Sequence, residues 1–334
     1  MRETQWIEEI KQTQRADVGQ LVPILQGGAD EALFRAADEV RQQTKGETVW
    51  IRAILEFSNV CRCHCRYCGL RAENTKLQRY RMTEQEIVET ALAAWRIGYQ
   101  TIVLQSGEDP VYDTDTVCRI VQGIKQNSTM SITLSIGELP ETSLRAMRQA
   151  GADRYLLKQE VADPGLYAQM HPGASQRNRL RCLRDLKRLG YETGSGFMIG
   201  LPGQTEEMIA RDLLLLQELR CDMAGIGPFL PHPDTPLHSA PAGSARMTKR
   251  AVALARLLLP EANLPATTAL GVLDSEEKNT VFSCGANVVM RKVTPWTHRR
   301  DYEIYPVAWR EEESMEQGRR ELEQTIRSLG RIPV

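Results

Sequence analysis

The sequence predicts an α/β protein built on a TIM-type (β/α)8 barrel, with helices before the barrel and a helical appendix after it. Three observations predict this fold. The chain has 334 residues, of which 42% are hydrophobic and 25% charged, as expected for a globular protein with a sizeable core. From residue 49 onward, short β-branched or apolar runs alternate with longer amphipathic segments. Eight such runs are present, and eight strands separated by helices indicate a closed parallel barrel, with an open doubly wound sheet as the alternative.

The segments are assigned in chain order by their periodicity. The first 46 residues are predicted to be helical, because Leu33, Ala36, Ala37 and Val40 fall on one helical face. The eight predicted strands are 49–57, 101–105, 131–136, 154–157, 192–199, 222–229, 265–270 and 281–290. The predicted helices between and after them include 83–98, 178–189, a helix from Thr205, 248–259 and 315–329.

Local signals support these helices. Thr83 and Glu86 form a capping box, and Glu206 and Glu207 place negative charge at the start of the helix from Thr205. The resulting division of the chain is an N-terminal helical segment at 1–48, the barrel at 49–306 and a C-terminal helical extension at 307–334.

Composition and charge exclude several classes of function. The formal net charge of −1 comes from 42 basic and 43 acidic residues, so no basic excess favours a nucleic-acid partner. The polar N-terminal segment does not resemble a secretory signal, and the apolar runs are too short to span a bilayer. Eight cysteines in such a chain are interpreted as reduced thiols of a cytoplasmic protein.

Three of these cysteines, Cys61, Cys65 and Cys68, follow the first predicted strand with C-x3-C-x2-C spacing. Three thiolates on a short loop can hold three irons of a [4Fe–4S] cluster, and the fourth iron is left free to bind a small molecule. An electron-transfer cluster usually has four cysteine ligands, and a zinc site normally has a second ligand pair downstream, which this sequence lacks. The spacing therefore predicts a cluster that performs chemistry at its open iron, for which an anaerobic host is expected.

Two neighbours within the motif leave alternatives open. Cys63 brings a fourth thiol into the same run, which admits a closed metal site, although a C-x-C pair has poor geometry for one cluster. His64 is either a metal ligand or an exposed loop imidazole, and the second interpretation is preferred.

Small residues and carboxylates follow the other predicted strands, at the barrel edge where function is expected. Gly107 and Glu108 follow the second strand, and Ser135 and Glu138 the third. Glu160 follows the fourth strand and can accept hydrogen bonds from ribose hydroxyls, or simply cap a helix. Arg177 and Arg179 come next, and a guanidinium there can hold a carboxylate in bidentate fashion.

The later strand ends carry further candidates. A glycine-rich loop at 196–205, which contains Met198, allows the backbone to approach a flat ligand or forms a bulge and turn. His232, in a proline-rich loop, either lines the cavity or has a structural role. Thr267 and Thr268 place two hydroxyls at the seventh predicted strand.

Together these motifs resemble those of the radical S-adenosylmethionine (SAM) enzymes. Longer stretches are similar to the HydE-type maturases of [FeFe]-hydrogenase, and more distantly to biotin synthase and methylornithine synthase. The resemblance covers roughly residues 30 to 306, and it is carried by ILEFSNVCRCHCRYCGLR, TIVLQSGEDP, GADRYLLKQE, YETGSGFMIGLPGQT, GIGPFLPHPDTPL, PATTALG and CGANVVM.

The resemblance implies one [4Fe–4S] cluster and SAM as cofactors, with reductive cleavage of SAM to methionine and a 5′-deoxyadenosyl radical. It implies that Cys61, Cys65 and Cys68 bind the cluster. The residues that it implies for SAM are Tyr67 near adenine, Gly107 and Glu108 at the amino group, Glu160 at the ribose, Arg179 at the carboxylate, and also Ser135 and Met198. The residues that it implies for an internal substrate cavity are Thr267, Thr268, Tyr302 and Tyr305.

The resemblance also implies a substrate and partners. The expected substrate is a cysteine-bearing iron–carbonyl–cyanide complex on the route to the diiron subcluster, with transient contacts to other maturases and to an electron donor. Some family members carry an accessory cluster on C-terminal cysteines, but no cysteine follows Cys284 here, so one cluster is predicted. Two other hypotheses stay open, namely a radical SAM mutase or synthase of another pathway and a non-catalytic iron–sulfur or metal-binding protein.

Overall fold

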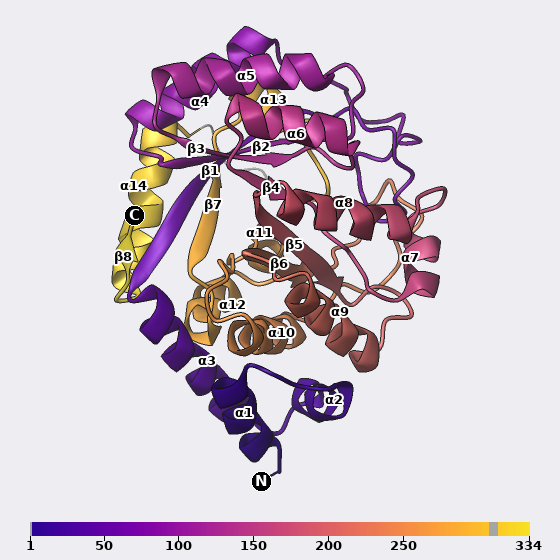
Figure 1. Cartoon of the computed structure of the whole chain (residues 1–334), viewed down its shortest axis with the longest axis vertical. Coiled ribbons are helices and arrows are strands. Elements are labelled where there is room, and N and C mark those ends of the chain that lie inside the picture. The colour runs from indigo at the N-terminus through magenta and orange to yellow at the C-terminus, as the bar shows by residue number, and fades with distance from the viewer. Residues whose placement is uncertain (1, 307–312) are drawn as a thin grey trace.

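The computed structural model describes residues 2–306 and 313–334. Its centre is an eight-stranded parallel sheet that curls into a barrel, with the strand order β6-β5-β4-β3-β2-β1-β7 and with β8 paired to β1 (Figure 1). The strands are β1 Thr48–Ser58, β2 Thr101–Ser106, β3 Ser131–Ser135, β4 Arg154–Leu156, β5 Glu192–Ile199, β6 Met223–Pro228, β7 Val288–Lys292 and β8 Ile332–Pro333. The parallel α/β architecture predicted from the sequence is confirmed.

Helices cover the outside of this sheet, as alternation along the chain requires (Figure 1). Those that follow β1 to β6 are α4 Glu84–Arg96, α5 Thr114–Asn127, α6 Glu141–Ala150, α7 Pro164–Met170, α8 Gln176–Arg188, α9 Glu206–Glu218 and α10 Ala245–Leu258. Thr83 and Glu86 form the predicted capping box, and Thr205 caps α9. The apolar faces of these helices other than α7 form one large core with the strands, and the buried residues of α7 belong to a second, smaller cluster with Phe229 and Leu237.

Three helices precede the barrel: α1 Arg2–Thr13, α2 Val18–Gln26 and α3 Asp30–Lys45. The predicted face of α3 is buried, since Leu33, Ala36, Ala37 and Val40 are at most 6% exposed. This helix packs on α10, and α2 packs on α9, so the segment covers the outside of the barrel near β5 and β6 (Figure 1).

The last predicted strands differ from the structure. The prediction of a strand over 265–270 was wrong, because helix α11 Thr268–Leu273 begins within it. The predicted strand 281–290 begins instead with the 3₁₀ helix η1 Val281–Cys284, and only β7 is extended. Helices α12 Ser275–Thr280 and α13 Trp296–Arg299 are short elements of the same region.

Residues 263–266 nevertheless connect β6 to β7. Asn263 forms an isolated bridge with Met223, and Pro265 forms one with Val288. The buried Arg256 guanidinium fixes this segment, because it donates hydrogen bonds to the carbonyls of Pro260 and Ala262 and to the side chain of Asn287. The predicted strand ends after these residues because Thr267 caps α11, its side chain accepting from the backbone amide of Leu270.

The described C-terminal residues 313–334 contain one helix and one short strand. Helix α14 Met315–Ser328 matches the predicted amphipathic stretch, and β8 then pairs with Thr48 and Val49 at the start of β1. The predicted boundary at 306/307 falls where the first described part of the chain ends, and residue 307 lies outside the described residues. No helix among the described residues is long and apolar enough to cross a membrane.

Candidate active site

A cavity of about 360 Å³ lies within the barrel, and strands β1 to β7 or the loops after them contribute to its wall. All of the residues predicted to bind the cluster, SAM or the substrate line this cavity: Cys61, Cys65, Tyr67, Cys68, Gly107, Glu108, Ser135, Glu160, Arg179, Met198, Thr267, Thr268, Tyr302 and Tyr305. The fold therefore brings together residues that are up to 244 positions apart, from Cys61 to Tyr305. The carboxyl-end location expected for a parallel barrel explains this convergence.

The cysteine loop follows β1 and turns its thiols inward. Cys61, Cys63, Cys65 and Cys68 all line the cavity, whereas the alternate residues Arg62 and His64 are exposed. The backbone amides of Cys63 and Glu108 both donate to the Sγ of Cys61, at 3.4 Å. His64 Nδ1 lies 2.7 Å from Glu73 Oε1, and the ring is exposed, in agreement with the interpretation of His64 as an exposed loop imidazole.

The donor set of this loop fits a [4Fe–4S] cluster. Thiolates are the usual ligands of such clusters, and three of them at C-x3-C-x2-C spacing face one cavity. In the described residues no three His, Cys, Asp or Glu side chains converge on a single metal position. A cubane does not require that convergence, because each thiolate binds a different iron.

Tyr67 is held beside the cysteines by His171, which follows α7. The Tyr67 hydroxyl lies 2.7 Å from His171 Nε2, and His171 Nδ1 lies 3.1 Å from the carbonyl oxygen of Tyr167. A carbonyl only accepts, so Nδ1 carries the hydrogen and Nε2 accepts from Tyr67. Burial lowers the pKa of His171 to about 4, which agrees with a neutral ring. This chain of hydrogen bonds fixes the orientation of the Tyr67 side chain.

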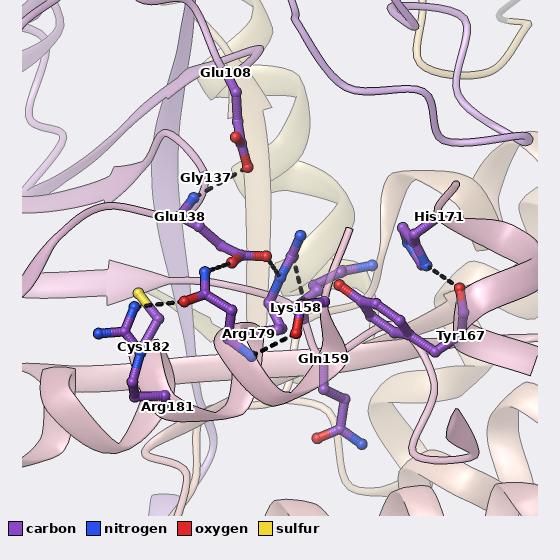
Figure 2. A network of polar contacts seen from close by, with 12 residues as sticks. Glu108, Gly137, Glu138, Lys158, Gln159, Tyr167, His171, Arg179, Arg181 and Cys182 are labelled. Atoms are coloured by element: carbon purple, nitrogen blue, oxygen red, sulfur yellow. Dashed lines mark hydrogen bonds and ion pairs between the residues drawn. The ribbon is translucent and has the colours of Figure 1, made fainter. Parts of the chain in front are cut away.

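A polar network joins the ends of β2, β3 and β4 to α8 (Figure 2). Glu108 Oε1 accepts from the backbone amide of Glu138 at 3.1 Å, and Arg179 Nε donates to Glu138 Oε1 at 2.6 Å. Arg179 Nη1 also donates to the carbonyl of Lys158 at 2.9 Å. Within the described residues Nη2 of Arg179 makes no hydrogen bond, so it is available to a ligand in the cavity.

The Gly107 turn packs tightly against the cysteine loop. Its amide donates to the carbonyl of Ser58, and a Cβ at this position would lie 2.3 Å from the carbonyl oxygen of Val60. The buried Asp109 accepts hydrogen bonds from Ser58 and Arg81, which anchors the turn from the other side. The position of Glu108 is therefore coupled to that of Cys61.

Glu160 has two unfavourable features that point to a ligand. Its φ angle is +66°, a left-handed conformation that costs a non-glycine residue roughly 1–2 kcal/mol. Its Oε2 atom is buried and has no hydrogen-bond partner among the residues that the structure describes. Backbone hydrogen bonds to Gly196 and from Met198 hold the residue in this conformation. Strained backbone and unpaired polar atoms of this kind gather at binding sites.

Replacing Glu160 by glycine is expected to stabilise the protein and to weaken its binding of SAM. Glycine adopts positive φ without strain, so we expect a gain of at most about 1 kcal/mol in the free energy of unfolding. Loss of a charged hydrogen-bond acceptor should raise the SAM dissociation constant by roughly 10- to 100-fold. Thermal unfolding and calorimetric SAM titration measure the two effects.

Arg220→Gly is the matched control for this prediction. Arg220 also has a positive φ, of 48°, but it lies in the turn between α9 and β6 and does not line the cavity. The Arg220→Gly substitution should therefore stabilise the protein about as much as Glu160→Gly does, and it should leave the SAM affinity unchanged. Equal SAM affinity in the Glu160→Gly protein and the wild type would contradict the predicted role of Glu160.

Thr267, Thr268, Tyr302 and Tyr305, the residues predicted to line a substrate site, lie in the wall of the same cavity. Gln105 donates to the Tyr302 hydroxyl at 3.0 Å. Sequence reasoning missed two charged residues of this wall, Glu56 and Lys292. A carboxylate in the apolar stretch ILEFS, at the same strand face as Ile54, was the available signal for Glu56.

Two other candidates lie apart from the cavity wall. His232 is 2% exposed and its Nε2 lies 3.8 Å from Glu303, in agreement with the structural role weighed for it. Arg177 is exposed on α8, whereas Arg179, half a turn further along, faces the cavity.

Comparison with known proteins identifies the family. Residues 55–257 match the model of the Radical SAM superfamily. The HydE subunit of the [FeFe]-hydrogenase maturase from Thermotoga maritima is 52% identical over 279 residues, which are 84% of this chain and 80% of that protein.

The chain belongs to the radical SAM superfamily and to its HydE family.

More distant radical SAM relatives share the fold. The 3-methylornithine synthase of Methanosarcina acetivorans is 30% identical over 78% of this chain and 73% of its own length. A crystal structure of methylornithine synthase has a TM-score of 0.84 at 26% identity, covering 98% of this chain and 97% of that one. A crystal structure of the hydrogenase maturase HydG also has a TM-score of 0.84, at 19% identity, over 99% of this chain and 76% of that one. Radical SAM enzymes bind a [4Fe–4S] cluster and SAM, and this HydE-family chain is an enzyme of that class.

Proposed function

We propose that this protein is a HydE-type maturase that acts in assembly of the diiron subcluster of [FeFe]-hydrogenase. The observation that carries the proposal is the 52% identity to HydE over most of both chains. The proposed substrate is a cysteine-bearing iron–carbonyl–cyanide precursor. The proposed transient partners are other hydrogenase maturases and an electron donor.

The proposed roles of the cavity residues follow their positions. Cys61, Cys65 and Cys68 hold the cluster, and when bound and reduced it supplies the electron that cleaves SAM to methionine and a 5′-deoxyadenosyl radical. The proposed contacts of SAM are the Gly107 turn and Glu108 for its amino group, Arg179 for its carboxylate, Glu160 for its ribose, and Tyr67, Ser135 and Met198 for the rest of the nucleoside.

Charge and hydrogen-bonding capacity support these roles. The free Nη2 of Arg179 can donate to a carboxylate, while Glu138 and Lys158 hold the rest of the guanidinium in place. The unpaired Oε2 of Glu160 can accept a hydroxyl. Apolar wall residues such as Leu157, Phe229 and Leu230 keep water from this part of the cavity.

We also propose that residues 1–48 support the barrel at 49–306 and that 307–334 extends it. The contacts of α2 and α3 with α9 and α10, and of β8 with β1, favour this division. A methylornithine synthase-like reaction is the second candidate, because that enzyme matches most of the fold, although at 30% identity rather than 52%.

Anaerobic reconstitution tests the proposal. With iron, sulfide, SAM and a reductant, the protein should form 5′-deoxyadenosine, and SAM should change the EPR signal of the reduced cluster. Added to an in vitro maturation mixture that lacks only HydE, the protein should restore hydrogenase activity. Failure to restore it, together with formation of methylornithine, would replace the first candidate by the second.

A further inference from the structure

An ion pair lies in the wall of the cavity, away from the cysteine loop. Glu56 on β1 and Lys292 on β7 meet across neighbouring parallel strands, with Lys292 Nζ 3.0 Å from Glu56 Oε1. Glu56 is 2% exposed, and both residues line the cavity together with Tyr302 and Tyr305. The pair therefore faces the space in which a substrate would lie.

Stability of the fold does not explain this pair. Glu56 is buried, whereas the Lys292 side chain is 26% exposed. Removing the Glu56 carboxylate from water carries a desolvation penalty that attraction to one ammonium seldom repays. Burial raises the pKa of Glu56, while Lys292 and Thr294 oppose the shift. A charge pair kept on a cavity wall under these conditions indicates a binding role.

Both partners have bonding capacity beyond the pair itself. Lys292 carries three N–H donors, and among the described residues its one ion pair is to Glu56. The ammonium also lies 5.7 Å from the centre of the Tyr302 ring. Glu56 accepts further from the Thr294 hydroxyl at 3.3 Å, which fixes one side of the carboxylate. Hydroxyls of Thr267 and Thr268 line the same cavity.

Charge balance determines which ligand the pair suits. A ligand with a single charge would attract one partner and leave the other buried without compensation, which is strongly unfavourable. A ligand with both an ammonium and a carboxylate satisfies both partners and keeps the site neutral. The two charges of an α-amino acid are separated by only two carbons, which suits two protein charges on adjacent strands.

We propose that Glu56 and Lys292 form a subsite for the zwitterionic group of an α-amino acid, with Glu56 binding the ammonium and Lys292 the carboxylate. The inference rests on the proposed function, since it places the amino-acid part of the cysteine-bearing substrate within the cavity. It assigns recognition of the substrate to two residues outside the proposed cluster and SAM sites.

The test compares three ligands on the cluster-loaded protein saturated with SAM, without reductant. The probes are S-methyl-L-cysteine, its N-acetyl derivative, which lacks the ammonium charge, and 2-(methylthio)ethylamine, which lacks the carboxylate. Saturation-transfer NMR measures their affinities. The wild type is expected to bind S-methyl-L-cysteine at least tenfold more tightly than either of the other two.

Single substitutions should remove this discrimination one charge at a time. The Glu56→Gln variant should bind S-methyl-L-cysteine and its N-acetyl derivative about equally. The Lys292→Met variant should bind S-methyl-L-cysteine and 2-(methylthio)ethylamine about equally. SAM affinity, measured in parallel, should not change in either variant. Undiminished discrimination in both variants, or no preference for the zwitterion in the wild type, overturns the proposal.

The double variant Glu56→Gln/Lys292→Met covers the case in which a single substitution prevents folding. It removes both charges, so its melting temperature should equal or exceed that of the wild type, while preference for the zwitterion disappears. A double variant that keeps the preference also overturns the proposal. Because no turnover is involved, the subsite can fail while maturation succeeds, or be upheld while maturation fails.

Discussion

Replacing Cys65 by alanine is expected to abolish cluster assembly and SAM cleavage together. Cys65 lies in the middle of the three-thiolate motif, and Cys61 and Cys68, the motif cysteines that remain, cannot hold a cube with one open iron. Cys63 is not expected to replace Cys65, because a C-x-C pair has poor geometry for one cluster. Iron and sulfide content after anaerobic reconstitution should fall to background. Formation of 5′-deoxyadenosine should fall below detection, because without the cluster no electron reaches SAM.

Cys63→Ala is the matched control, since Cys63 is two residues away in the same loop and lines the same cavity. The substitution removes only the thiol, so the backbone amide of residue 63 can still donate to Cys61 Sγ. Iron content and SAM cleavage should therefore stay near those of the wild type. Loss of the cluster in Cys63→Ala would make Cys63 a ligand and contradict the three-cysteine assignment.

Replacing Gly107 by alanine is expected to destabilise the protein and to impair SAM binding. The new Cβ would lie 2.3 Å from the carbonyl oxygen of Val60 and 2.7 Å from the Cβ of Cys61. Because real Cβ atoms do not approach backbone so closely, the Gly107 turn and the cysteine loop must move apart. Overpacking of this kind costs about 1–3 kcal/mol of stability.

Thermal unfolding of the metal-free protein reports the loss of stability from Gly107→Ala. SAM titration of the reconstituted protein reports the displacement of Glu108 and of the cluster. Gly123→Ala on α5 is the control, because its Cβ would meet only the side chain of Val88, at 3.1 Å, and alanine favours the helix by up to about 1 kcal/mol. Unchanged stability and SAM affinity in Gly107→Ala would show that the turn does not constrain the cysteine loop.

The sequence alone predicted most of the helices and six of the barrel strands. Its signals there are local, as in the capping box of Thr83 and Glu86 or the buried face of α3. The predictions were wrong between β6 and β7, where Thr267 caps α11 at the place of the expected strand, and where Arg256 and Asn287 hold the preceding residues 262–264 with side-chain hydrogen bonds. Partners so far apart in the chain leave no periodic pattern.

The cysteine spacing determined the class of chemistry, because the distance between thiolates on one loop is set by the loop itself. The sequence also predicted cavity residues at the strand ends, such as Gly107, Glu108 and Glu160, since the carboxyl ends of parallel strands meet at one edge. Tyr67, Tyr302 and Tyr305 were implied only by the family resemblance. Only the tertiary structure decided which atoms of those residues are free, as with Arg179 Nη2 and Glu160 Oε2, and which are already paired. Only it brought Glu56 to Lys292, because β1 and β7 are neighbouring strands on which Lys292 pairs with Ile54, two residues before Glu56.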